Sequence, residues 1–143
     1  MNEDTINLLK ECNSGCKSAT NSLEQILSHV KNEKLRGIII KYNDMHIKLG
    51  DECHEMLNDT GEDEKDPGMI AKTMAAVGTD IKLTIDDSVH KAADLLVDGC
   101  AMGIKSLSGY VNKYCTADDA SRDIANRLIN IEKDLMDELL QFL

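Results

Sequence analysis

Apolar residues recur every three or four positions along most of this 143-residue chain. In the first stretch the recurring residues are Leu9, Cys12, Cys16, Ala19, Leu23, Ile26 and Val30. Such spacing is typical of a helix that packs one face against other helices. The pattern restarts in a new register at Leu35, Ile38, Tyr42, Met45, Leu49 and Met56. This shift predicts a tight turn near 31–33 and an antiparallel pair of helices.

Two further long helices are predicted in the second half of the chain. Their inward residues are Val89, Ala93, Leu96, Cys100, Gly103, Leu107, Tyr110 and Tyr114, and then Ile124, Leu128, Ile131, Leu135, Leu139 and Phe142. Because the spacing runs unbroken between them, only a capping signal places the turn at 115–119, with Thr116 as the cap and Asp119 three positions later. Thr84 followed by Asp87 resembles a capping box that opens the first of these two helices.

The connection between the two pairs, residues 58–83, is longer than a hairpin turn requires. Gly61 suits the left-handed end of a helix, and Asp66 with Pro67 suits the start of the next one. A shorter amphipathic helix is then predicted from Met69, Ile70, Met74, Val77 and Ile81. Such a connection lets the third long helix run parallel to the second, and up-down-up-down order is the alternative. We therefore predict a single all-α domain, 1–143, a four-helix bundle with an extra shorter helix in the crossover.

Composition supports long helices and restricts the partners. The chain has three Tyr, one Phe, no Trp and one Pro, whereas strands favour aromatic residues and turns favour proline. Its net charge of −10 would repel a nucleic acid and an anionic membrane surface. No apolar run approaches the roughly 20 residues that span a bilayer, and the acidic start lacks the features of a signal peptide. We expect a soluble, cytoplasmic protein.

Two segments carry a resemblance to a known family, LLKECNSGCKSATNSL in the first helix and IANRLINIEKDLMDEL in the last. Together with the layout of the helices, they look like a bacterial ferritin-like family of unknown function, over nearly the whole chain. The resemblance implies the fold and a history of metal chemistry, but it implies no particular activity.

A ferritin-like di-iron site takes one Glu from each of two helices and a Glu-x-x-His pair from each of the other two. The chain contains no Glu-x-x-His, and the nearest pattern in its second helix is Asp51-x-x-His54. The predicted register turns these two residues outward and Glu52 inward, where we expect it to pair with a lysine or to meet water. In the last helix, Glu132 flanks the inward face. We therefore expect an incomplete di-iron site.

Five cysteines form an odd set without a C-x-x-C pair, which favours reduced thiols. Cys12 and Cys16 lie one turn apart, and an antiparallel hairpin returns Cys53 to the level of Cys12. We favour the interpretation that the thiols pack as small apolar residues and that His46 forms hydrogen bonds at the edge of the core. The alternative is a site for a soft or transition metal ion such as Cu(I) or Zn(II). Its ligands would come from Cys12, Cys16, His46, Glu52, Cys53 and Cys100.

These features favour a non-enzymatic helical bundle without a cofactor, which binds a protein partner or forms a homodimer. No catalytic residues are assigned, because the chain has neither a Gly-rich phosphate loop nor a recognised Ser/His/Asp or Cys/His pattern. The apolar ending LLQFL favours an interface, since such a surface is usually covered. The first alternative is a metal-binding or metal-storage bundle, and the second is a di-iron oxidase-like enzyme.

Overall fold

A computed structural model describes residues 1–61 and 88–143 of the chain. Over these residues it consists of α1 (Glu3–Leu27), α2 (Glu33–Thr60), α4 (Ser88–Lys113) and α5 (Asp119–Leu139), followed by the short 3-10 helix η1 (Leu140–Phe142). This part of the chain contains no strand, and none of its helices is long and apolar enough to cross a membrane. Over residues 1–61 and 88–143, the prediction of an all-α arrangement with four long helices is confirmed.

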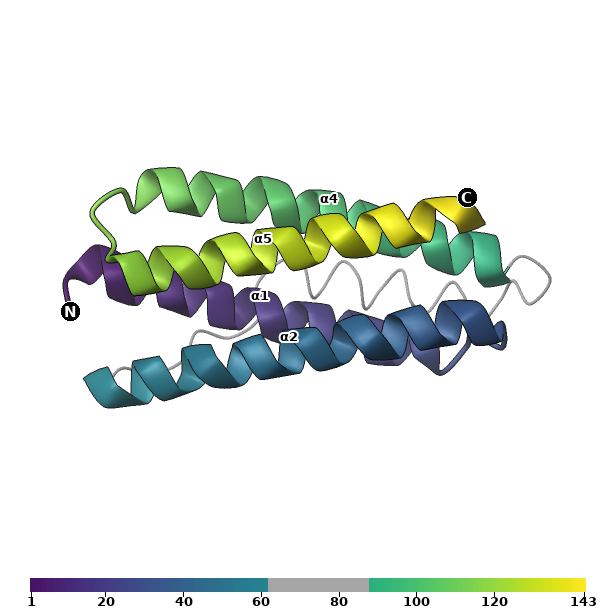
Figure 1. Ribbon diagram of the computed structural model, residues 1–143, viewed down its shortest axis with the longest axis horizontal. Coiled ribbons are helices and arrows are strands. Elements are labelled where there is room, and N and C mark those ends of the chain that lie inside the picture. The colour runs from purple at the N-terminus through teal and green to yellow at the C-terminus, as the bar shows by residue number, and fades with distance from the viewer. Residues whose placement is uncertain (62–87) are drawn as a thin grey trace.

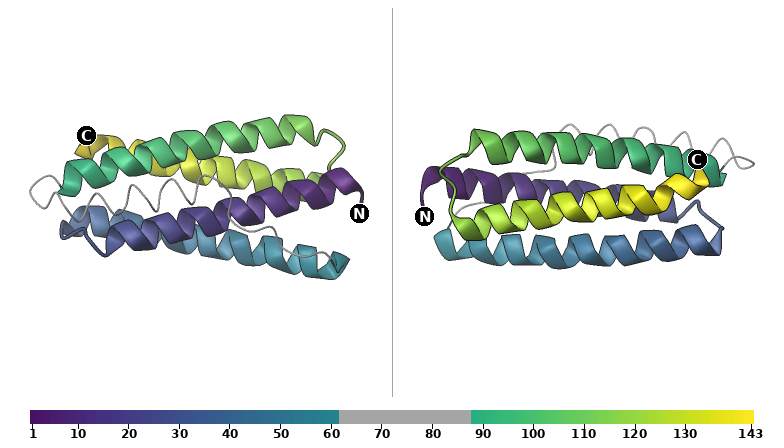
Figure 2. Two further views of the ribbon diagram at one scale, coloured as in Figure 1. Left: turned by 180° about the vertical axis from the view of Figure 1, so that it is seen from behind. Right: turned by 45° about the horizontal axis from the view of Figure 1, so that its top comes forward.

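The four helices lie side by side along one axis (Figure 1). The second helix returns antiparallel to α1, and α5 returns antiparallel to α4, so the chain forms two hairpins. The two hairpins pack so that α4 runs in the same direction as α2 (Figures 1 and 2). This is the parallel order that we expected from a long connection. The shorter helix predicted over 69–81 and the capping box predicted at Thr84 lie outside the described residues.

Short polar side chains start three of the helices, as their sequences favour. The side-chain oxygen of Asn2 accepts the N–H of Thr5 at 2.8 Å, and Asn32 does the same for Leu35 at 2.9 Å. At the end of α2, Gly61 adopts the left-handed conformation with φ of 73° that a residue without a Cβ adopts readily. The turns therefore fall where the sequence predicts them.

The cap of α5 differs from the prediction. Asp118, and not Thr116, caps the helix by accepting the N–H of Ser121 at 2.8 Å. Thr116 instead donates its N–H and its hydroxyl to Asp4 Oδ2, at 3.0 and 2.6 Å. The hydroxyl of Thr5 in turn accepts the N–H of Asp118 at 2.8 Å. A tertiary contact with the start of α1 has therefore overridden the local capping signal, and it ties the two hairpins together at one end.

The inward face of α2 also differs from the prediction. The expected register turned Met45, Glu52 and Met56 inward, yet all three are only partly buried. The fully buried residues lie one position later, at His46, Cys53 and Leu57. A repeat of 3.5 residues drifts by about 20° per heptad relative to a straight helix of 3.6 residues per turn. Over the length of α2 this drift moves the core contact by one residue.

Candidate functional site

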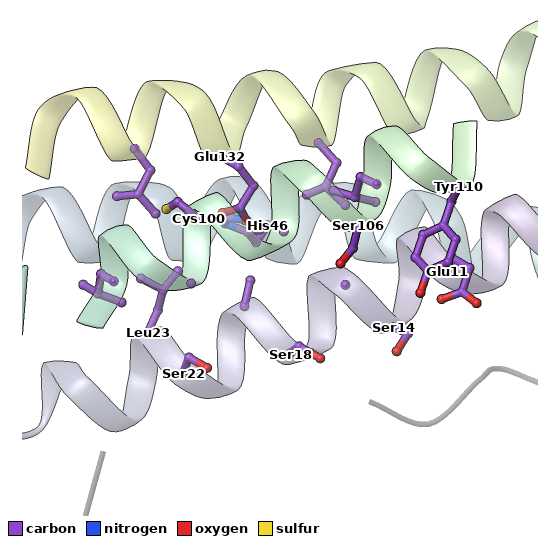
Figure 3. Close-up of a pocket in the computed structure, with 18 residues that line it drawn as sticks. Glu11, Ser14, Ser18, Ser22, Leu23, His46, Cys100, Ser106, Tyr110 and Glu132 are labelled. Carbon is purple, nitrogen blue, oxygen red and sulfur yellow. The ribbon is translucent and has the colours of Figure 1, made fainter. Parts of the chain in front are cut away.

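A cavity of about 390 Å³ lies in the bundle, lined by α1, α4 and α5 and by His46 of α2 (Figure 3). Apolar walls are formed by Leu23, Leu96, Leu107, Leu128 and Leu135. Sites for small molecules typically have volumes of about 300–1,000 Å³ and mostly apolar walls with a few polar groups. The cavity fits this description in both size and lining.

Small residues on the facing helices leave this space open. The first helix contributes Ser14, Ser18 and Ser22, spaced by one turn each and no more than 6% exposed. Opposite them, Gly103 of α4 faces Glu132 of α5, and a Cβ on this glycine would lie 3.6 Å from the Glu132 carboxyl carbon. A larger side chain at any of these positions would reduce the cavity. The serine spacing is visible in the sequence, but we had not connected it with a site.

A hydrogen-bonded group of three polar side chains occupies one side of the cavity, across from the serines of α1 (Figure 3). His46 is fully buried, its Nδ1 lies 2.7 Å from the carbonyl oxygen of Tyr42, and its Nε2 lies 2.5 Å from Glu132 Oε1. Because a carbonyl oxygen only accepts, Nδ1 must carry a hydrogen. The prediction that His46 forms hydrogen bonds is confirmed, and the pair with Glu132 is the central contact of this group.

Charge distinguishes the His46–Glu132 pair from a neutral hydrogen bond. Burial lowers the pKa of His46, but the hydrogen bond to Glu132, the charge of that carboxylate and the Tyr42 carbonyl together outweigh it and raise the pKa above its ordinary value. The raised pKa favours the imidazolium form, which donates from both nitrogens. The pair carries one positive and one negative charge, and its net charge is zero.

Cys100 completes the group from α4. Its thiol is hydrogen-bonded to Glu132, and burial together with this carboxylate raises the pKa of the thiol. It therefore stays protonated at neutral pH and donates to the carboxylate. Glu132 thus joins α2, α4 and α5, although we predicted it to flank the inward face. That prediction was wrong, and the spacing of Leu128, Glu132 and Leu135 is the signal that would have placed it inside.

The other buried thiols form a second cluster, between α1 and α2. Cys12, Cys16 and Cys53 are at most 2% exposed. A hydrogen bond to Cys53, and then burial, raises the pKa of Cys16, and burial raises that of Cys12. All five cysteines are free thiols. Neutral, buried thiols fit the packing interpretation. Within 1–61 and 88–143, no three His, Cys, Asp or Glu residues are arranged to hold a metal ion.

Glu52 lies apart from both groups. Its carboxylate makes a bidentate ion pair with Arg127 of α5, and both N–O distances are 2.9 Å. The side chain of Glu52 is 43% exposed and that of Arg127 is 46% exposed. The hydrogen bond to Arg127 lowers the pKa of this carboxyl. Glu52 was expected inward, paired with a lysine or near water, but it is partly exposed and pairs with an arginine instead. The six candidate ligands therefore divide among the cavity, the thiol cluster and the surface.

A second hollow of about 280 Å³ lies between α1 and α2, and it also borders His46. Asn13 lines it, is 1% exposed, and its side-chain Nδ2 has no hydrogen-bond partner within the described part of the chain. Lys17, Asp51 and His54 are among its other lining residues. This hollow is smaller and more polar than the main cavity, and water would satisfy the asparagine.

No family model matches the chain, and neither a curated protein nor a solved structure matches it. The ferritin-like resemblance therefore stays an expectation from the sequence. The cavity and the residues around it are what the molecule offers for a functional assignment.

Proposed function

We propose that this chain is a non-enzymatic binding protein that encloses a small, mostly apolar molecule in the cavity between α1, α4 and α5. The observation that carries the proposal is the 390 Å³ volume with its leucine walls and one polar group. Protein interiors are normally close-packed, so a concave, mostly apolar space of this size is the default place for a small molecule to bind. A ligand that binds there and not to the unfolded chain would stabilise the bundle.

The chemistry of the polar group supports binding without catalysis. Both ring nitrogens of His46 are engaged, one with Tyr42 and the other with Glu132. The Cys100 thiol is held in its protonated form, whereas a nucleophilic cysteine needs a lowered pKa. A general base or nucleophile needs a free lone pair directed at a substrate, and neither His46 nor the protonated Cys100 thiol offers one. These residues are suited to positioning a ligand.

A ferritin-like relationship is part of the proposal. In such bundles, ligand and metal sites are built in the core from side chains on facing helices. Here His46 and Glu132 come from two packed helices, α2 and α5, and meet in the core. The parallel course of α2 and α4 agrees with the long crossover of that fold (Figure 1). The chain would thus use the position of a metal site for an organic ligand.

We also propose a cytoplasmic location and an interface with a second copy or another protein. Five free cysteines are consistent with a reducing compartment. At the C-terminal end, Leu140 and Leu143 are 50% and 52% exposed, and an apolar surface of this kind is favourable to cover. Sedimentation at several concentrations tests the interface, and a single monomeric species throughout would exclude self-association.

Soft-metal binding is the second candidate function, because Cys12, Cys16 and Cys53 lie together between α1 and α2. The thiols would have to lose their protons and turn toward one ion, since they are not arranged around one now. Titration with Cu(I) against a competing chelator tests this. One tightly bound ion per chain that is lost in Cys53→Ser would support it, and equal uptake by both proteins would exclude this cluster.

Binding of prodan, a neutral naphthalene dye whose emission moves to the blue in apolar surroundings, tests the main proposal. We expect saturable binding to the native chain and at least a tenfold loss in Gly103→Leu, where the leucine projects toward Glu132 and occupies the cavity. Gly109→Leu on the same helix is the matched control, because a side chain there meets open space. It should bind the dye normally.

Ser18→Leu fills the cavity from α1. It tests whether the loss of binding comes from filling the cavity and not from a local change at Gly103. Circular dichroism melting establishes that each variant is folded. Native protein that does not bind the dye saturably, or equal binding by the filled variants and the Gly109→Leu control, would overturn the proposal.

A further inference from the structure

The outward face of α2 carries an apolar stripe. Among the described helices, α2 packs mainly against α1 and α5 and forms one edge of the bundle (Figure 1). Ile40 and Ile47 lie two turns apart on its outward side, and they are 51% and 41% exposed. Gly37 lies one turn before Ile40, and a Cβ there would meet no atom of the described part of the chain within 4 Å. This face is therefore open to a second helix that covers both isoleucines.

Charge divides the same helix into a basic start and an acidic end. The charged residues around its start are Lys31, Glu33, Lys34 and Arg36, and the exposed acids at its end are Asp51, Glu55 and Asp59. Three cations and one carboxylate give the start a charge of +2, and three carboxylates give the end −3. Other charged residues of α2 lie in ion pairs, Lys41 with Glu138, Asp44 with Lys48, and Glu52 with Arg127. The two ends are thus electrostatically complementary to each other.

From the apolar stripe and this division of charge, we propose that the outward face of α2 binds the same face of a second copy, with the two helices antiparallel. A two-fold symmetric contact uses one surface on both subunits. The antiparallel order brings the basic start of each helix to the acidic end of the other, and the isoleucines of both copies meet between them. The parallel order would place like charges opposite one another. This inference rests on the proposed self-association, and its surface is distinct from the C-terminal one.

The contact between the two copies is small, because each copy contributes a single long helix. Interfaces of permanent dimers bury more area than one pair of helices provides. We therefore expect a reversible dimer with a dissociation constant in the micromolar range. The isoleucines supply the apolar contact, whereas the exposed charges select the orientation more than they add affinity.

Sedimentation equilibrium from about 1 µM to about 1 mM covers this range of affinity and tests the contact. A reducing agent prevents the exposed Cys115 from linking two chains. Ile47→Glu should raise the dissociation constant of the dimer at least tenfold, and Ile40→Glu should do the same. Met102→Glu is the matched control, because it places the same charge at a 39% exposed apolar residue of α4. It should form dimers like the native chain.

Charge reversal tests the orientation of the two helices. Lys34→Glu and Asp51→Lys should each raise the dissociation constant at least threefold, because each reverses one side of the pairing between the two ends. Both changes in one chain should restore it to within a factor of two. The single changes alter the net charge in opposite directions. Effects of opposite sign would therefore follow net charge, and they would overturn the antiparallel arrangement.

The outcomes separate this inference from the self-association on which it rests. Circular dichroism melting establishes that each variant is folded. A dimer that is lost in Leu140→Glu and retained in Ile47→Glu would place the contact at the C-terminal end and overturn the inference. Equal dimerisation by Ile47→Glu and Met102→Glu would overturn it as well. A native chain that stays monomeric over the whole concentration range would contradict the proposed self-association itself.

Discussion

The first helix packs in two ways, closely against α2 and around a cavity on the side of α4 and α5. Toward α2, the contact is so close that a Cβ added to Gly50 would lie 3.2 Å from the Cβ of Cys16. Toward α4 and α5, serines and Gly103 face one another across a cavity of about 390 Å³. Both regions are lined by small side chains, yet one brings the helices into contact and the other leaves space.

Small residues therefore do not by themselves determine how closely two helices pack. The distance between helix axes follows from the side chains at the contact. In the cavity region, leucines such as Leu23, Leu96 and Leu128 hold the helices apart around the small residues. In the thiol cluster, Cys16 meets Gly50 directly, so the helices approach each other. The cavity is thus a consequence of large and small residues alternating on the same faces.

The largest effect is expected from breaking the polar group of the cavity region. His46→Leu should lower the free energy of unfolding by about 3–5 kcal/mol, because it leaves the Glu132 carboxylate buried without its charged partner. Urea denaturation measures this. Glu52→Gln disrupts the exposed pair with Arg127 and should cost at most about 1 kcal/mol. Similar losses in both variants would show that His46 and Glu132 are not a buried ion pair in solution.

A smaller loss is expected from enlarging the closest contact of the thiol region. Gly50→Leu should destabilise the chain by about 1–3 kcal/mol, because its side chain must push α1 away at Cys16. Gly37→Leu on the same helix meets open space, and it should gain up to about 1 kcal/mol from helix propensity. Thermal melting of both variants decides the point. If Gly50→Leu is as stable as Gly37→Leu, the two helices are not in close contact there.

Alkali should weaken the His46–Glu132 pair and the buried thiols from different starting points. The folded-state pKa of His46 is raised, so the stability that it contributes is complete below its ordinary value of 6.5 and is lost as the pH rises through the folded-state pKa. The thiol pKa values of Cys12, Cys16 and Cys100 are also raised, and their contribution begins to be lost only above the ordinary value of 9.0. Urea denaturation from pH 6 to pH 10 should therefore show a decline that begins near pH 6.5 and a further decline that begins above pH 9.0.

Variants assign each decline to its groups. Glu132→Gln should remove the first decline, and Cys12→Ala should reduce the second. If the first decline persists in Glu132→Gln, another group causes it.

The smallest effect concerns the rate of thiol modification and leaves stability unchanged. Cys115 is exposed and should react first with a disulfide reagent. Cys100 borders the cavity and should follow, ahead of the three thiols between α1 and α2. Prodan bound in the cavity should slow the reaction of Cys100 only. Simultaneous reaction of the four buried thiols would mean that the two regions open together.

Much of the fold could be predicted because helix packing leaves a periodic pattern in the sequence. The four long helices, the first turn and the buried Cys12, Cys16 and Cys100 follow from spacing, and a capping signal placed the second turn. The cap of α5 did not follow, because Thr116 bonds to Asp4, a residue more than a hundred positions away. Local sequence carries no information about such a contact.

The site was harder to predict than the fold, for a geometric reason. A repeat of 3.5 residues per turn along α2 predicts Glu52 on the inward face and His46 at its edge. The actual helix turns His46 fully inward. Glu132 was missed because a carboxylate is expected outside unless its partner is known. The cavity itself depends on how far apart the helices stand, which no single helix encodes.

The hydrogen bonds between the start of α1 and the turn before α5 have a mechanical consequence. Asp4 and Thr5 hold Thr116 and Asp118 at one end of the bundle. Toward the opposite end, α2 and α5 are joined by an exposed ion pair of Lys41 and Glu138 at 3.6 Å. A tilt of one hairpin against the other would therefore pivot about the first end and spread the second. A ligand bound as proposed above would then exchange through the second end, on a route set by residues that never touch it.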